Sequence, residues 1–122
     1  MEIITSNLAP KALGPYSQAI KVNGLLFISG QGGLQPESGT LVDGVEAQTL
    51  QAIKNIEAIL KEAGLDFTNV VKTTCFLADM ADFATFNGVY QEYFVSKPAR
   101  SCVAVKELPA NFLVEIEVIA EV

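Results

Sequence analysis

The sequence contains no histidine and no tryptophan among its 122 residues. The absence of histidine excludes every mechanism that uses an imidazole as a base, a proton relay or a metal ligand, including hydrolase triads and histidine-bearing zinc sites. Any chemistry in this chain therefore proceeds without imidazole.

Positive charge and cysteine are also scarce. Lysine and arginine total 8 against 14 acidic residues, a formal charge of −6, so phosphate backbones are repelled and nucleic acid is an improbable main partner. Cys75 and Cys102 stand far apart, with no CxxC pair and no basic segment ahead of an apolar start. We expect a reduced, cytoplasmic protein whose thiols are small buried hydrophobes unless a site uses one. No apolar run approaches the about 20 residues of a membrane span.

Half of the residues are apolar and only 18% are charged, and no linker, repeat or low-complexity stretch interrupts the chain. Residues 1–122 are therefore expected to form a single domain. The positive mean hydropathy indicates an apolar surface that is buried against other subunits.

Five segments have the composition of strands. Ser17–Val22 and Leu25–Ser29 flank an Asn-Gly pair, which favours the type I′ turn of a β-hairpin. Val70–Ala78 is β-branched and mostly apolar, as expected for an interior strand. Arg100–Lys106 and Phe112–Ala120 follow, joined by a short turn.

Two segments have helical periodicity. A capping-box-like pair, Asp43 and Glu46, opens an amphipathic helix of about five turns that ends at Gly64. Asp79 caps a second helix, and Pro98 ends it. The order ββαβαββ predicts an α+β fold of two layers, with both helices on one face of a mixed sheet because each crossover is right-handed.

Arg100 is the only arginine, and it stands at the start of a predicted strand. A guanidinium is a planar fork of donors that matches a carboxylate. The alternative is a surface ion pair with one of the 14 acidic residues. The sequence alone leaves both open.

Alternation in the last strand puts Glu115 and Glu117 on one face, away from the helices. The same rule puts Arg100 and Cys102 on that open face and Val103 on the covered face. A hairpin of the last two strands then sets Cys102 opposite Glu115 and Arg100 opposite Glu117. The alternative is a cross-strand salt bridge on a solvated face.

A glycine-rich loop, Ser29–Gly33, lacks the GxGxxG and GK[ST] spacings, so we reject nucleotide binding there. Gly30 is a position where the backbone can approach a ligand closely. Tyr16 is by itself more typical of a packing residue than of a ligand contact.

Several short motifs together resemble one family. The sequence is similar to the reactive intermediate deaminase family, also called RidA, YjgF or L-PSP endoribonuclease, and the similarity covers essentially the whole chain. The resemblance implies a chorismate-mutase-like fold, a six-stranded mixed sheet with two helices on one face, assembled as a homotrimer with three clefts between subunits. The motifs are Gly14–Gln18, Ser29–Gln31, Val71–Thr74, Phe83–Asn87, Pro98–Val103 and Val114–Glu117.

The resemblance also implies an activity, the hydrolysis of 2-imino acids such as 2-iminobutanoate and 2-iminopropanoate to 2-oxo acids and ammonia, without a cofactor. These imines are tautomers of enamines that pyridoxal-phosphate-dependent dehydratases release. By the same resemblance, Arg100 grips the substrate carboxylate and Glu115 orients the attacking water. The residues that match the lining of the cleft are Tyr16, Ser29, Gly30, Asn87 and Cys102.

Two segments depart from the family pattern. Gly32 and Gly33 stand where the family commonly has a bulky aliphatic residue and then proline or a small residue, which predicts a more flexible and roomier loop. The segment Tyr93–Lys97 is shorter than in many relatives and lacks the aromatic residue often found next to Pro98. We expect the first departure to bear on substrate size and the second on the rim of the cleft.

Three functions compete. An imine deaminase uses both Arg100 and Glu115, whereas a regulatory trimer that senses a carboxylate metabolite needs the arginine alone. Retention of both residues favours the deaminase. An endoribonuclease is disfavoured by the acidic charge and the absence of histidine, because RNA cleavage usually needs a proton-transfer pair near neutrality and a basic track.

Overall fold

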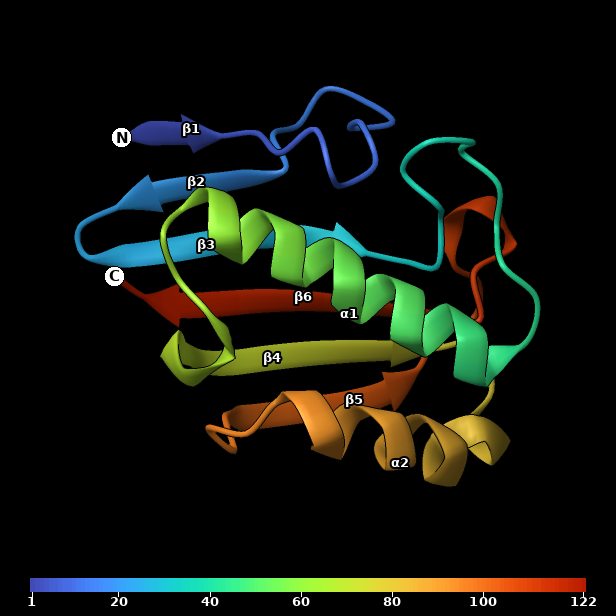
Figure 1. Ribbon diagram of the computed structural model, residues 1–122. Helices are drawn as coiled ribbons and strands as arrows, with labels where there is room; N and C mark the ends of the chain where they lie inside the picture. The colour runs from blue at the N-terminus through green and yellow to red at the C-terminus, as the bar shows by residue number, and fades with distance from the viewer.

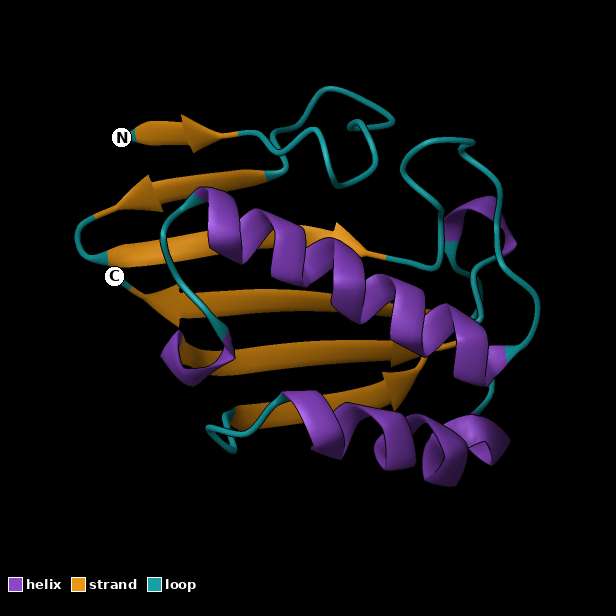
Figure 2. Ribbon diagram, viewed as in Figure 1, coloured by secondary structure: helices purple, strands orange, loops and turns teal.

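The computed structural model describes residues 1–122 as two layers, a sheet of six strands with two helices against one of its faces (Figure 1). Figure 2 shows the same arrangement by element type, with both helices in front of the sheet. The predicted fold is therefore confirmed. None of the helices is long and apolar enough to span a membrane. In chain order the elements are β1 (Glu2–Ile4), β2 (Ala19–Val22), β3 (Leu25–Gln31), α1 (Val45–Glu62), β4 (Val70–Leu77), α2 (Phe83–Tyr93), β5 (Ala99–Ala104) and β6 (Val114–Glu121).

The local signals for turns and helix ends hold in most places. Asn23 and Gly24 adopt φ angles of 51° and 76° between β2 and β3, as a type I′ turn requires. Gly64 has a φ of 76° and donates to the carbonyl of Lys61, which closes α1 in a Schellman-type end. The expected capping box is wrong, because Gly44 is the N-cap of α1 and no side chain caps it.

The second helix starts and ends slightly differently from the prediction. Asp79 accepts a hydrogen bond from the backbone of Ala81 and so caps a short 3₁₀ turn, Met80–Asp82, which leads into α2. The helix ends at Tyr93, before the proline at position 98 that was expected to end it.

The strand order β1-β2-β3-β6-β4-β5 corrects the expected hairpin of the last two strands. β6 lies antiparallel between β3 and β4, and β5 pairs with β4 in parallel at the edge of the sheet. Every second residue of β6 is buried, whereas no residue of β5 is, so β6 gains more from a central position. Strands that are consecutive in the chain are neighbours in the sheet only about two-thirds of the time, and β5 and β6 are not neighbours here.

Candidate active site

The alternation predicted for β6 is confirmed. Val114 and Ile116 are fully buried under the helices, and Glu115 and Glu117 lie on the opposite, open face of the sheet. The two carboxylates therefore stand on the face that no helix covers.

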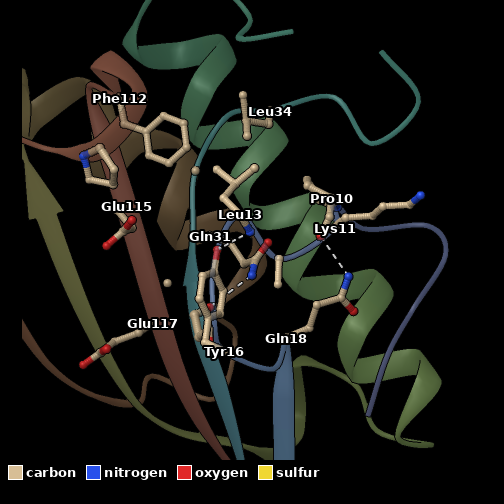
Figure 3. A pocket seen from close by; sticks show the side chains of 15 residues that line it. Pro10, Lys11, Leu13, Tyr16, Gln18, Gln31, Leu34, Phe112, Glu115 and Glu117 are labelled. Carbon is tan, nitrogen blue, oxygen red and sulfur yellow. Dashed lines mark hydrogen bonds between the residues drawn. The ribbon is translucent and has the colours of Figure 1, made fainter. Parts of the chain in front are cut away.

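Glu115 belongs to a hollow of about 430 Å³ on that face (Figure 3). β3 contributes Ser29 and Gly30, and the loop before β2 contributes Tyr16, whose hydroxyl accepts a hydrogen bond from the Leu13 N–H at 3.0 Å. We call these four residues, Tyr16, Ser29, Gly30 and Glu115, the acid half-site. The structure thus brings together four of the seven residues that the sequence singled out.

The absence of a side chain at Gly30 leaves room for the carboxylate of Glu115. A Cβ atom at this position would lie 2.7 Å from the carboxyl carbon and from Oε2 of Glu115, too close for any real contact. The carboxylate has no ion-pair partner, since the one salt bridge of the chain joins Lys61 to Glu57. Burial, and secondarily repulsion from Glu117, raise the pKa of Glu115. The result is a carboxylate that more readily takes up a proton and faces an open hollow.

Buried and partly buried hydrogen bonds hold the loop that borders this hollow. The Gln18 side chain donates to the carbonyl of Pro10 at 2.8 Å and accepts from the Ser6 N–H at 2.7 Å. Ser29 Oγ donates to the carbonyl of Ser17 at 2.6 Å, so its proton is engaged while its oxygen can still accept. These bonds fix the segment that carries Tyr16.

Two buried polar residues of α1 support the other loops of the hollow, and neither was predicted from the sequence. Asn55 Nδ2 donates to the carbonyls of Gly32 at 3.1 Å and Leu34 at 2.9 Å. Gln48 Oε1 accepts from the Leu113 N–H at 2.8 Å. They are two helical turns apart and therefore lie on the same buried face of α1, beside its apolar residues. Polar residues at this spacing could have been recognised in the sequence as buried.

The expectation of a roomier loop at Gly32 and Gly33 is wrong. A Cβ atom on Gly32 would lie 2.4 Å from the Phe112 ring, and one on Gly33 would lie 2.8 Å from the Cα of Gln48. Both glycines therefore permit close packing rather than free space.

Arg100 lies on the other side of the sheet, against α2. Its guanidinium donates to Asn87 Oδ1 at 2.7 Å and lies over the rings of Tyr90 and Phe83, at 4.8 Å and 5.6 Å from their centroids. It forms no ion pair, which removes the surface salt bridge as an explanation for it. Asn87 and Arg100, which we call the arginine half-site, line a second hollow of about 620 Å³. The remaining guanidinium donors are available to a carboxylate.

This placement corrects the predicted faces of β5. Arg100 and Cys102 are register neighbours of Thr73 and Cys75, which are fully buried on the helix side, while Val103 is 46% exposed on the open side. The prediction assumed that only the covered face is apolar. Here the apolar Val103 lies on the open side, so alternation in β5 could not tell the two faces apart.

Cys102 lies in neither hollow. It is half-buried against the core beside Cys75, and both thiols are free. Burial raises the pKa of Cys102 against an opposing effect of the Arg100 charge, and burial raises the pKa of Cys75 to about 12. Nowhere in the chain do three cysteine, aspartate or glutamate side chains lie close enough to hold a metal ion.

The two half-sites are thus separated within one chain. Glu115 is on the open face of β6, and Arg100 is on the helix face of β5, with β4 between these strands. One chain alone does not bring the guanidinium to the carboxylate.

Comparison with known proteins agrees with this architecture. A family model described as "Endoribonuclease L-PSP" matches residues 6–122. The mouse protein named 2-iminobutanoate/2-iminopropanoate deaminase is 54% identical over 98% of this chain and 90% of its own. The crystal structure of RidA from an Antarctic Psychrobacter superposes with a TM-score of 0.97 at 41% identity over the whole of both chains. That of Escherichia coli TdcF with bound serine gives 0.96 at 38% identity, covering 100% of this chain and 99% of that one. The chain therefore belongs to the RidA/YjgF family of reactive intermediate deaminases.

Proposed function

We propose that this protein is a cofactor-independent deaminase that hydrolyses small 2-imino acids, such as 2-iminobutanoate and 2-iminopropanoate, to 2-oxo acids and ammonia. The observation that carries the proposal is the unpaired, partly buried carboxylate of Glu115 facing an open hollow. The free guanidinium donors of Arg100 and the activity named for the mouse relative support it.

In this mechanism Arg100 binds the substrate carboxylate and orients the adjacent C=N group. Glu115 accepts a proton from a water molecule as the water oxygen bonds to the imine carbon. Glu115 returns this proton to the imine nitrogen, which gives a carbinolamine. The carboxylate then takes the proton of the new hydroxyl group and passes it to the amino group, so that the C–N bond breaks and the products are a C=O group and ammonia. The raised pKa of Glu115 suits a group that takes up a proton and returns it.

We further propose that the site is completed by a second copy of the chain within a homotrimer. A head-to-tail contact that closes after three copies joins the acid half-site of each chain to the arginine half-site of its neighbour. Exposed apolar side chains on the open face support this assembly, since Phe27 and Val103 are 41% and 46% exposed there. Light scattering should give a mass three times that of the 13.1 kDa chain. A monomer at micromolar concentration would contradict the shared site.

A coupled assay tests the activity. A pyridoxal-phosphate-dependent dehydratase acting on serine or threonine supplies 2-aminoacrylate or its homologue, and release of the 2-oxo acid and ammonia is followed. Substoichiometric protein should speed the release, and Glu115→Gln should not. Carboxylate binding without any acceleration would instead support a regulatory trimer, and the proposal would be rejected.

A further inference from the structure

Phe112 forms one wall of the hollow that contains Glu115. The residue is only 6% exposed, yet it lines the hollow together with Leu34, and Figure 3 shows both at the same end. The imagined Cβ of Gly32, at 2.4 Å from Cδ2 and Cε2 of this ring, shows that the ring occupies the space of the missing side chain. The ring of Phe112, from the loop before β6, thus forms the side of the hollow where Gly32, just after β3, has no side chain.

The wall is held firmly in place. Phe112 donates its backbone N–H to the carbonyl of Pro109 at 3.1 Å, and the next N–H, from Leu113, is bonded to Gln48 of α1. On the opposite side of the contact, Asn55 holds the carbonyl of Gly32. Because α1 fixes both partners, the backbone segments that carry Phe112 and Gly32 cannot separate without breaking these hydrogen bonds.

We propose that Phe112, packed on Gly32, is the specificity-determining residue of this site and disfavours 2-imino acids whose side chains are large enough to reach the ring. This inference rests on the proposed deaminase function and adds the substrate size to it. Branched aliphatic and aromatic side chains meet the ring and are disfavoured.

Kinetics on imino acids of increasing size test the inference. An amino-acid oxidase generates the imines with methyl, ethyl, isobutyl and benzyl side chains, and kcat/KM is measured for each. Phe112→Ala should raise the isobutyl-to-methyl ratio of kcat/KM at least about tenfold, the scale at which pockets discriminate added methylenes. Phe67→Ala removes another buried ring, one outside the hollow, and it should leave the ratio unchanged.

Two more variants keep the test decisive if Phe112→Ala folds poorly. Phe112→Leu should change the ratio in the same direction by less. Gly32→Val combined with Phe112→Ala supplies the wall from the other side, and it should return the ratio toward that of the wild type. An unchanged ratio in Phe112→Ala or Phe112→Leu with intact turnover of the methyl imine would overturn the inference.

A binding measurement separates this inference from the proposed function. Calorimetric titration with 2-oxobutanoate and 4-methyl-2-oxopentanoate measures size selection without turnover. If the wild type turns over no imino acid, the proposed function fails. Tighter binding of the larger acid to the Phe112 variants would then still support the size limit, and unchanged relative binding would overturn it.

Discussion

Exchanging Arg100 for lysine tests whether the guanidinium binds a carboxylate. Lysine keeps the charge but loses the planar fork that can meet two oxygens at once. It also loses the hydrogen bond to Asn87 Oδ1 at 2.7 Å and much of the stacking over Tyr90 at 4.8 Å. A hydrogen bond to a charged group contributes about 1.5–3 kcal/mol, so kcat/KM should fall by about tenfold or more.

The assay is steady-state deamination of 2-iminopropanoate, and the loss should appear mainly in KM because the carboxylate is bound before and during the reaction. Lys54→Arg, an exposed exchange on α1, is the control and should leave both constants unchanged. Asn87→Ala should give a smaller loss than Arg100→Lys, since it frees the guanidinium without removing it. If kcat/KM were unchanged in Arg100→Lys, the carboxylate-binding role of Arg100 would be refuted.

Three further predictions concern the acid half-site. Glu115→Gln should keep the fold and bind 2-oxo acids but lose most turnover. Glu117→Gln should retain more activity. It should also move the acid limb of the pH–rate profile to lower pH, because it removes a charge that raises the pKa of Glu115. Because the pKa of Glu115 is raised in the folded state, the stability that this carboxyl contributes is lost as pH rises through the folded-state pKa. The side chain of Glu115→Gln is neutral at every pH, so this variant should have a higher melting temperature than the wild type at pH 7. The difference in melting temperature should vanish below the ordinary glutamate pKa of 4.5. Gly30→Ala should reduce kcat at least about tenfold with little change in melting temperature, since its Cβ displaces the carboxylate; full activity would show that the position of the carboxylate does not matter.

Local patterns predicted much of the fold. Asn23 and Gly24 predicted a turn because few residues accept two successive positive φ angles, and Gly64 predicted a helix end for the same reason. The alternation around Glu115 and Glu117 predicted their shared face because β6 has a strictly buried side. These signals depend only on near neighbours in the chain.

Features that depend on distant segments could not be predicted in this way. The position of β6 between β3 and β4 depends on contacts with segments distant in the chain, and the side of the sheet taken by Arg100 is decided by the rings of α2. The contact of Phe112 with Gly32 joins residues 80 positions apart. Neither residue alone indicates the other, so the wall of the hollow emerges only from the fold.

The central claim, that each site combines an acid half-site and an arginine half-site from two chains, is tested most directly by mixing two inactive variants. Glu115→Gln and Arg100→Ala are co-expressed with different tags, and oligomers that contain both are purified. In a three-membered ring that contains both variants, one site of about three pairs an intact Glu115 with an intact Arg100, so about a third of the wild-type activity should return. Mixed oligomers as inactive as either parent would contradict a site shared between chains.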